Sequence, residues 1–319
     1  MIQLDRRHLL TGLGAMSVAA CSDPFEIGTG KKPPKGGIGG TGIVGTLTDF
    51  GSLLVNGLRI ETDGSAEITD AFGTMAGDAM SVGHHLTIEA ATVDGVLVAR
   101  RVRIVHPVIG RVDRADPSGM RGIVAGVPIQ LEPGAEGVLT PGARVAVSGA
   151  WRDTTVIASR IDERPGDGPV VISGVIRRAG TSAPPTLAGV RIRTSVALPE
   201  SGTFVTAIGR HAATGFVAEQ IIPGRFTGAA GPLTALSIDG YLEVAATAPF
   251  FAVSGLGHSF DEDAKLAAFR DQRSIFSGTY DGKFVVRDTL RLPEALPERR
   301  RLLAGIVDGT VTPEAIPAR

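Results

Sequence analysis

A short turn that recurs at constant spacing is the feature that most restricts the fold of this chain. Each copy opens on the pattern Gly-x-apolar, and a turn of the form x-Gly-apolar follows 15 or 16 residues after the opening glycine. The openings are Gly42-Ile43-Val44, Gly110-Arg111-Val112, Gly174-Val175-Ile176 and Gly224-Arg225-Phe226. The turns are Asn56-Gly57, Ala125-Gly126, Ala188-Gly189 and Asp239-Gly240. The constant spacing predicts one structural unit, repeated four times.

The residues at and after these turns predict β-hairpins. Asn56-Gly57 and Asp239-Gly240 are pairs that type I′ turns favour, because both central residues of that turn need a positive φ. After the first turn, apolar and charged side chains alternate from Leu58 to Glu61. This period of two is that of a strand with one buried face, and it excludes a helix.

Each unit ends with a strand in which the alternation is interrupted. Small or apolar residues three positions apart break the period of two in the segments 98–102, 157–161, 217–221 and 286–290. We expect a β-bulge at the same place in each copy, because a bulge bends a short sheet and so helps to close it into a barrel.

The repeat divides the chain into four units: unit 1 (42–106), unit 2 (107–165), unit 3 (170–222) and unit 4 (223–292). A unit of about 50 to 70 residues is close to the lower limit for an independent core. Closing its sheet removes the unpaired edges. The sequence therefore predicts an all-β chain of tandem small barrels of the OB type, with Ig-like sandwiches as the alternative arrangement.

Two segments depart from the repeat. In unit 4, Ser259 and Glu262 form the pattern of a helix capping box, and Leu266 and Phe269 lie three residues apart as on an apolar helix face. We therefore expect a short helical insertion at about 259–271. The segment 293–319 contains three consecutive arginines and several prolines, and we expect it to be a loosely held tail.

Residues 1–20 have the order of an export signal. Arg6 and Arg7 precede an uncharged apolar run that ends at Ala20 and is too short to span a bilayer. The arginine pair followed by two leucines is similar to a twin-arginine signal, although Thr11 stands where a lysine is common.

The single cysteine lies directly after this signal. Val18-Ala19-Ala20-Cys21 resembles a bacterial lipobox, which predicts cleavage before Cys21 and lipidation of that residue with acyl chains such as palmitate. Ser22 rather than Asp follows it, which favours the outer membrane, facing the periplasm. The Gly, Pro and Lys-rich segment 21–41 then forms a tether.

Composition excludes several classes of protein. The 32 basic and 33 acidic residues are spread along the chain, which disfavours nucleic acid as a partner. Trp151 and the two tyrosines are too few to stack successive bases, and we expect Trp151 to pack over a neighbouring unit or to contact a partner. One cysteine excludes intrachain disulfides and Cys-based zinc sites.

The histidines give no metal or catalytic constellation. None has a second ligand at zinc spacing, and the sequence predicts no cofactor and no catalytic residue. His84 and His85 are adjacent on a predicted strand, so their side chains point to opposite faces and cannot hold one metal. We expect one of them to be packed and the other to be exposed to water.

The strongest cluster of potential ligands lies in unit 4. His258, Asp261 and Asp263 fall within six residues and are weak candidates for a metal site, although carboxylates at a helix start also explain them. Gly257-His258-Ser259-Phe260-Asp261 differs from the nucleophile elbow of hydrolases in its last position. A hydrolase or a metal-dependent binder centred on 257–263 therefore stays open as an alternative function.

The repeat as a whole resembles exported bacterial proteins with tandem copies of the domain of unknown function 5666 family. The opening, the hairpin turn and the later alternating strand carry this resemblance over about 42–292, most clearly in the first two or three units. The family implies no established activity, so no catalytic residue is carried over.

Together these features predict a membrane-anchored lipoprotein of the cell envelope. In this interpretation Cys21 provides the lipid anchor, Arg6 and Arg7 direct export, and the barrels bind an envelope protein or a glycan without catalysis.

Overall fold

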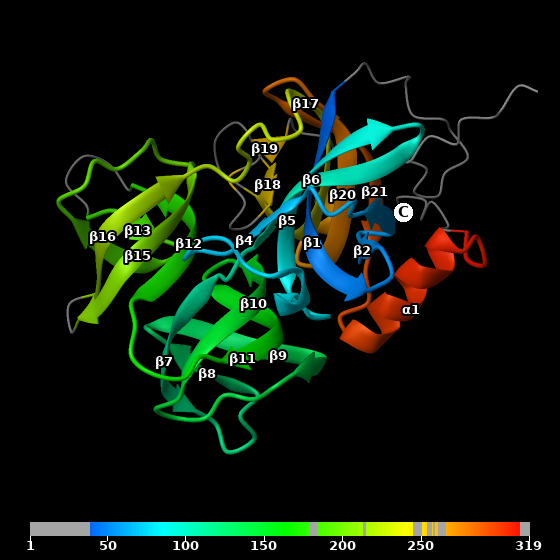
Figure 1. Ribbon diagram of the computed structural model, residues 1–319. Coiled ribbons are helices and arrows are strands. Elements are labelled where there is room, and N and C mark those ends of the chain that lie inside the picture. The colour runs from blue at the N-terminus through cyan, green and yellow to red at the C-terminus, as the bar shows by residue number, and fades with distance from the viewer. Residues whose placement is uncertain are drawn as a thin grey trace, which may run out of the picture.

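The computed structural model describes residues 39–178, 184–212, 215–244, 251–253, 257, 259–260 and 266–312. Strands hold 58% of the chain and helical segments 8%, so the predicted all-β class is confirmed. The strands gather into small barrels that pack against one another, as Figure 1 shows, with one helix at the C-terminal side.

Unit 1 is a closed five-stranded barrel. Its strands are β1 (Gly40–Asp49), β2 (Leu53–Val55), β3 (Leu58–Glu61), β5 (His85–Val93) and β6 (Val96–Ile104). Antiparallel pairs join β1 to β2, β2 to β3, β6 to β5 and β5 to β1, and one parallel pair joins β3 to β6. This order with a single parallel pair is that of an OB-type barrel and not of a sandwich. The connection from β3 to β5 carries β4 (Glu67–Thr69) and the 3₁₀ turn η1 (Gly77–Ala79).

Unit 2 repeats this barrel. Its strands are β7 (Val108–Ala115), β8 (Arg121–Val124), β9 (Val127–Glu136), β10 (Arg144–Arg152) and β11 (Thr155–Glu163). The pairings run from β7 through β8, β9, β11 and β10 back to β7, again with one parallel pair between β9 and β11. The prediction of small closed barrels is confirmed.

Units 3 and 4 use the same strand order, although β13 and β19 are only two residues long. Unit 3 contains β12 (Val170–Arg177), β13 (Thr186–Leu187), β14 (Val190–Thr194), β15 (Phe204–Ala212) and β16 (Gly215–Pro223), paired in the same ring. Unit 4 contains β17 (Leu233–Val244), β18 (Phe251–Val253), β19 (Ser259–Phe260), β20 (Arg273–Tyr280) and β21 (Phe284–Arg291). Within the described part of unit 4, no pairing joins β19 to β21.

The predicted bulge is present at the same place in all four units. The last strand of each unit has one extra residue at Arg100, Ser159, Glu219 or Arg287. In units 2 to 4 the residue opposite the bulge is a glycine, namely Gly149, Gly209 and Gly278. A Cβ added to any of them would lie 2.0 to 2.2 Å from a carbonyl oxygen of the bulged strand. In units 2 to 4 the facing position therefore has no room for a side chain, whereas in unit 1 it is occupied by Ala90.

Three of the four predicted hairpins form and the fourth does not. Asn56, Ala125 and Ala188 have φ of 57, 47 and 50°, and each precedes a glycine of positive φ, as a type I′ turn requires. Asp239 and Gly240 instead lie inside the continuous strand β17, paired with Ile275 and Ser274 of β20. The hairpin prediction was wrong here, because the side chain of Asp239 is buried against Arg273 and β20 continues along the whole segment.

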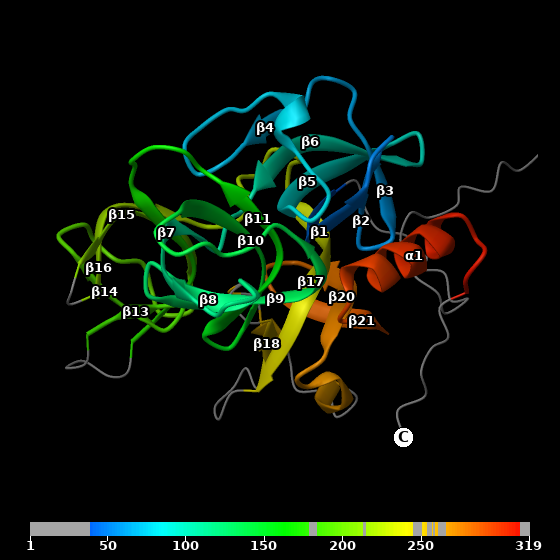
Figure 2. The same cartoon turned by 90° about the horizontal axis from the view of Figure 1, so that it is seen from below.

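The opening strands of the units join the barrels to one another. Strand β1 pairs in parallel with β17, so units 1 and 4 share one sheet, and β7 pairs antiparallel with β12, so units 2 and 3 share another. Figures 1 and 2 show β1 and β17 side by side although they are far apart in the sequence. Because β1 lies between two barrels, Ile43 packs into the core of unit 1 and Val44 into that of unit 4.

Trp151 belongs to the core shared by units 2 and 3. It is buried, and its indole N–H donates to the carbonyl oxygen of Ser173 at 2.9 Å. The expectation that it packs over a neighbouring unit is confirmed, and a burial of this extent excludes direct contact with an external partner.

The expected helical insertion in unit 4 differs from the structure. Ser259 and Phe260 form strand β19, paired with β18, so Ser259 does not cap a helix. A 3₁₀ turn, η2 (Leu266–Phe269), follows, and Leu266 and Phe269 are buried in the core of unit 4. Leu266 and Phe269 are thus buried on one side, as their spacing predicts. Ser259 and Phe260 instead belong to the sheet, because they pair with β18.

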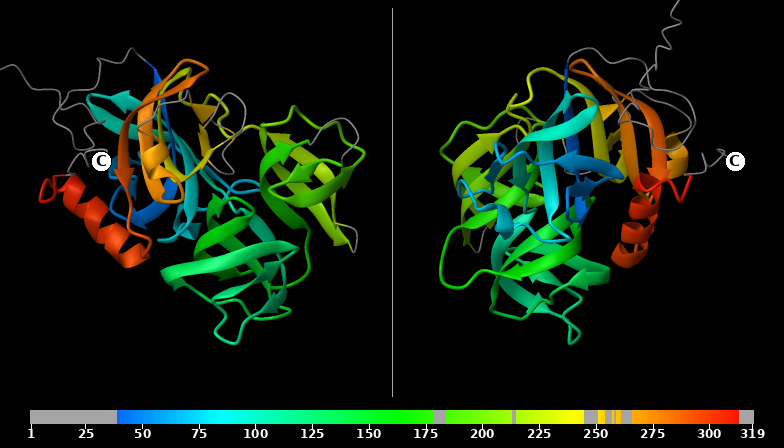
Figure 3. Two further views of the ribbon diagram at one scale, coloured as in Figure 1. Left: turned by 180° about the vertical axis from the view of Figure 1, so that it is seen from behind. Right: turned by 45° about the vertical axis from the view of Figure 1, so that its right-hand side comes forward.

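The tail expected to be loose contains the one α-helix of the described chain, α1 (Leu296–Val307). Leu296, Arg299 and Leu303 are buried on one face of it, and Leu303 packs with Ile275 and Leu290 of unit 4. Figure 3 shows α1 lying along the outside of units 1 and 4. The prediction was wrong for this segment. Arg299, one of the three consecutive arginines, is buried on the inner face of α1, and the sequence alone does not distinguish it from its two neighbours.

Candidate functional site

Five polar side chains meet in the interior where units 1, 2 and 4 and helix α1 touch. We call Thr46, Glu132, Asp239, Arg273 and Arg299 the central ion-pair cluster; each of them is at most 2% exposed. Thr46 comes from β1, Glu132 from β9, Asp239 from β17, Arg273 from β20 and Arg299 from α1. No two of the five lie on the same element, so the cluster forms only when these parts of the chain are assembled.

Arg273 is at the centre of this cluster. Its Nε and one terminal nitrogen donate to the two carboxylate oxygens of Asp239, both at 2.8 Å. The other terminal nitrogen donates to Glu132 at 2.6 Å, and Thr46 accepts a further hydrogen bond at 2.8 Å. The two-point contact with Asp239 matches the planar fork of a guanidinium and fixes the orientation of the side chain.

Glu132 joins Arg273 to the helix. Its second carboxylate oxygen accepts a hydrogen bond from Arg299 at 2.5 Å. Arg299 also donates to the carbonyl oxygens of Pro293 and Glu294, just before α1. Two guanidinium groups therefore face two carboxylates, which balances the formal charge of a site that water does not reach.

The pKa shift of Asp239 agrees with this balance of charges. Burial alone would raise the pKa of Asp239, but the charge and hydrogen bonds of Arg273 outweigh it and lower the pKa to about 2. For Glu132 burial is the larger effect and raises the pKa against the attraction of Arg273 and Arg299. At the edge of the cluster, the hydroxyl of Tyr241 donates to Glu294 at 2.9 Å, and burial raises the pKa of Tyr241.

A second buried acid, Glu89, is bound by backbone N–H groups. Glu89 on β5 accepts hydrogen bonds of 2.7 to 2.8 Å from the N–H groups of Thr227, Gly228 and Ala229, and from the hydroxyl of Thr227. These residues belong to the connection between β16 and β17, at the start of unit 4. The contact attaches that connection to unit 1 and fills the acceptor positions of Glu89.

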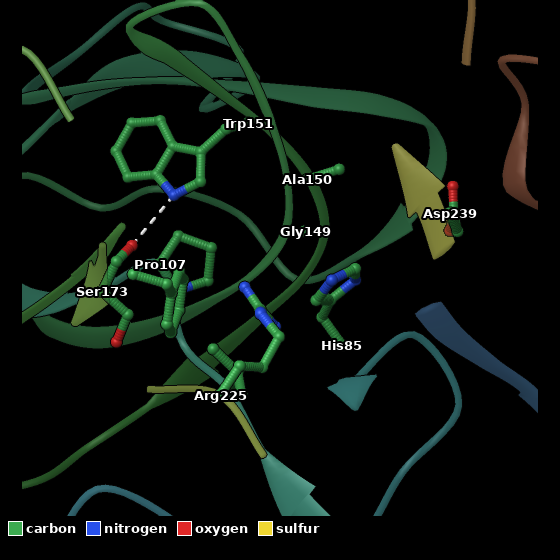
Figure 4. A pocket seen from close by; sticks show the side chains of 10 residues that line it. His85, Pro107, Gly149, Ala150, Trp151, Ser173, Arg225 and Asp239 are labelled. Carbon is green, nitrogen blue, oxygen red and sulfur yellow. Dashed lines mark hydrogen bonds between the residues drawn. The ribbon is translucent and has the colours of Figure 1, made fainter. Parts of the chain in front are cut away.

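A small internal cavity lies where all four units meet, shown in Figure 4. About 10 Å³ of it is open to the centre of a water-sized sphere, which is room for about one water molecule. We call it the junction cavity; it is lined by His85, Val105, Pro107, Gly149, Ala150, Trp151, Ser173, Phe204, Arg225 and Asp239.

Arg225 is the unusual member of this lining. It is 6% exposed, lies over the ring of Phe204 at 3.8 Å and donates to the hydroxyl of Thr87 at 2.9 Å. Its Nε is buried without a hydrogen-bond partner. Arg225 lies at the start of unit 4, between β16 and β17, and its side chain contacts unit 3 through Phe204 and unit 1 through Thr87.

Three histidines are buried beside the junction. His84 contacts Asp162 at 2.9 Å through Nε2, and its ring meets the edge of His106 at a centroid distance of 6.0 Å. His85 lines the junction cavity, and its Nδ1 is buried without a partner. The expectation that one of His84 and His85 is exposed to water was wrong: they are 5% and 3% exposed, because other units cover both faces of this strand.

Burial also determines the charge state of two of these rings. It lowers the pKa of His85 to about 3, and the nearby charges of Arg225, Arg273 and Arg299 act in the same direction against Asp239. It lowers the pKa of His106 to about 3 as well, with His84 as the next contribution. Both rings are therefore neutral at pH 7.

One serine–histidine pair of the described chain lies in the interior. Ser148 and His106 are a serine and a histidine within 3.3 Å, the arrangement of an activated nucleophile. Both are buried, with 0% and 2% exposure, so a substrate cannot approach the hydroxyl. Among the residues that the structure describes, no group of three His, Cys, Asp or Glu could hold a metal ion.

The site residues predicted from sequence lie outside the described residues. This holds for Arg6, Arg7 and Cys21 of the export and lipidation signal and for His258, Asp261 and Asp263 of unit 4. None of the described helices is both long and apolar enough to cross a membrane.

The residues of the central ion-pair cluster were missed by the sequence interpretation. Asp239 was assigned to a turn and Arg299 to a loosely held tail. The one local signal is the placement of Asp239 among the apolar residues of its strand, where an isolated charge demands a partner. No spacing in the sequence shows which residues these partners are.

Comparison with known proteins assigns a family to unit 1. No curated protein and no solved structure matches the chain. A family model, the domain of unknown function DUF5666, matches residues 41–103, which span β1 to β6 and so cover the barrel of unit 1. Unit 1 is therefore a DUF5666 domain.

Proposed function

We propose that this protein is a non-catalytic lipoprotein of the bacterial cell envelope that presents a fixed array of β-barrels to a protein or glycan partner. The observation that carries the proposal is the central ion-pair cluster. Glu132 of unit 2 pairs there with Arg273 of unit 4 and with Arg299 of α1, so separating these parts would leave charges buried without partners. Such an array holds the outer faces of the barrels in constant relative positions.

The architecture supports binding as the role of these faces. OB-type barrels bind ligands through one sheet face and its adjoining loops, and the array offers several such faces in fixed positions. In contrast, the reactive side chains described above are turned inward. A fixed spacing suits recognition of an extended partner, because several weak contacts on one rigid body add in affinity.

The N-terminal segment supports the anchoring part of the proposal. The lipobox ending at Cys21, the arginine pair Arg6-Arg7 and Ser22 favour a lipid anchor in the outer membrane, facing the periplasm. A tether of about 20 Gly, Pro and Lys-rich residues has an average end-to-end distance of about 25 Å. The barrels would then stay near the membrane without being fixed to its surface.

Fractionation of cells tests the anchor. We expect the wild-type protein in the membrane fraction after washing with high salt and its release by detergent. The Cys21→Ser variant should lose labelling by a palmitate analogue and leave the membrane fraction. As a control, adding Ser22→Cys to the Cys21→Ser chain shifts the thiol by one residue and should not restore the anchor. A Cys21→Ser variant that stays membrane-bound would contradict the proposal.

Crosslinking in intact cells tests the binding role. The array should capture a specific protein or glycan, and mass spectrometry of the purified adduct identifies it. The triple variant His258→Ala, Asp261→Ala, Asp263→Ala separates this proposal from a hydrolase or metal-dependent binder centred on 257–263. Capture should persist in the triple variant. Loss of capture on this substitution alone, in a folded protein, would favour the other function.

A further inference from the structure

Arg225 carries a buried charge that no carboxylate of the described chain neutralises. Its contacts are one hydroxyl, that of Thr87, and the face of the Phe204 ring. Neither is an anion. A guanidinium stays protonated in proteins, so this site holds a cation with little compensation.

The neighbouring charges increase this imbalance. Arg103 is a second, largely buried guanidinium, and it donates to the hydroxyl of Thr206. Burial and the charge of Arg103 lower the pKa of Arg225 well below its usual range, as expected for a cation without a counter-ion. The acid on the same strand as Thr87 is Glu89, whose carboxylate already accepts four hydrogen bonds from residues 227 to 229.

The junction cavity lies beside this charge. Figure 4 shows the guanidinium of Arg225 and the ring of His85 turned toward the same space. The Nε of Arg225 and the Nδ1 of His85 are both buried without partners. A neutral imidazole carries one N–H, and Nδ1 can be that donor. The cavity thus offers two donors and an excess of positive charge.

We infer that the junction cavity binds a single monatomic anion of the size of chloride, held by Arg225 and by the Nδ1–H of His85. The space holds about one water-sized sphere, which restricts the ligand to a single atom and excludes a polyatomic anion. A water molecule would satisfy the two hydrogen bonds but would leave the charge of Arg225 without compensation. The carboxylate in the wall, Asp239, is neutralised by its two hydrogen bonds with Arg273.

This site goes beyond the proposed function, because it concerns the assembly of the array and not its partner. The lining comes from all four units: His85 from unit 1, Trp151 from unit 2, Phe204 from unit 3 and Asp239 from unit 4. An anion that binds here binds only to the assembled chain. It therefore stabilises the array as a ligand stabilises a folded protein.

Thermal unfolding in halide and in gluconate salts tests the inference. We expect the Tm to rise by several degrees with sodium chloride or bromide, and to level off, relative to sodium gluconate at equal ionic strength, because gluconate cannot enter the cavity. The Arg225→Met variant keeps the apolar stem and removes the charge, and it should lose the halide-specific rise. The Arg210→Met variant is a matched control, since Arg210 is exposed, and it should keep the rise.

Bromide located by anomalous diffraction gives a second measurement that does not depend on how the variants fold. Crystals of the wild-type protein grown or soaked in sodium bromide should show an anomalous peak in the junction cavity, within hydrogen-bonding distance of Arg225 and His85. Two results would overturn the inference: an equal Tm in halide and gluconate, or a cavity that contains water and no bromide peak.

Discussion

The side chains of Glu132 and Arg299 meet at 2.5 Å in the interior, although 167 positions separate them in the sequence. Glu132 belongs to the second barrel, and Arg299 lies on the helix that follows the fourth. Through Arg273 the same carboxylate is linked to Asp239 and Thr46. One glutamate therefore connects units that the repeat alone would leave independent.

Replacing Glu132 by Gln should destabilise the protein strongly. The substitution keeps the shape of the side chain but leaves Arg299, and in part Arg273, as buried cations without a carboxylate. We expect the free energy of unfolding to fall by about 3 kcal/mol or more, as for other broken buried ion pairs. Urea denaturation measures this change.

The matched control is Glu219→Gln. Glu219 pairs with Arg210 at 3.5 Å, and both side chains are more than 60% exposed, so this change should cost no more than about 1 kcal/mol. Equal losses for the two variants would show that the central ion-pair cluster contributes no more than a surface pair.

The glycines opposite the bulges should not accept a methyl group. In Gly278→Ala the new Cβ would lie 2.0 Å from the carbonyl oxygen of Val285, which forces β20 and β21 apart. We expect a loss of about 2 kcal/mol or more in the free energy of unfolding. Gly77→Ala is the control, because an added Cβ there meets its first neighbour at 3.6 Å and the backbone has no positive φ. A stable Gly278→Ala protein would contradict the role assigned to the bulge.

Asn56 should be more sensitive than the residues at the same turn position in units 2 and 3. Its side-chain amide donates to the carbonyl oxygens of Val44 and Ser237 and to the hydroxyl of Ser237, so it links units 1 and 4. Asn56→Gly keeps the positive φ and removes these bonds, and we expect a loss of about 2 kcal/mol. Ala125→Gly and Ala188→Gly should each change the free energy of unfolding by less than about 1 kcal/mol in the same assay. A loss as small as theirs for Asn56→Gly would show that the turn geometry alone matters.

Stability should fall as the pH is lowered from neutral. The pKa values of His85 and His106 are about 3 in the folded protein and 6.5 in an unfolded chain. Between these values the unfolded chain binds protons that the folded chain does not, so the free energy of unfolding decreases with falling pH. The slope should be on the order of 1 kcal/mol per pH unit for each histidine.

Urea denaturation at pH 6.5, 5.5 and 4.5 measures this slope. His85→Gln should reduce the slope, because it removes one of the two histidines, His85 and His106, that bind a proton in the unfolded chain but not in the folded chain. His211→Gln should leave it unchanged, because His211 is exposed on unit 3. A His85→Gln protein with the wild-type slope would show that His85 is not the source of the pH dependence.

Local rules of backbone chemistry account for the parts of the fold that could be predicted. Asn56-Gly57 identifies its turn because few residues other than glycine and asparagine adopt a positive φ. The three-residue offsets identify the bulges because a strand with one buried face must otherwise alternate. Both signals are contained within a few neighbouring residues.

Asp239 and Arg299 could not be predicted because their environment comes from distant parts of the chain. Asp239 followed by glycine has the local chemistry of a turn, and only Arg273, 34 positions later, keeps it inside a strand. Arg299 is one of three adjacent arginines, and helix geometry turns this one inward while Arg300 bonds the carbonyl oxygen of Thr48 at the surface of unit 1. The junction cavity likewise has no sequence signature, since its lining comes from all four units.

The parallel pairing of β1 with β17 has a consequence for how this architecture can evolve. In an open array of repeats, copies can be gained or lost at either end, because each contacts only its neighbours. Here the first and last units share a sheet, so the array is closed on itself. An added or deleted copy would separate these two strands. The number of barrels in this arrangement is thus set by the pairing of β1 with β17, and changes that preserve it are most easily placed in the loops and outer faces.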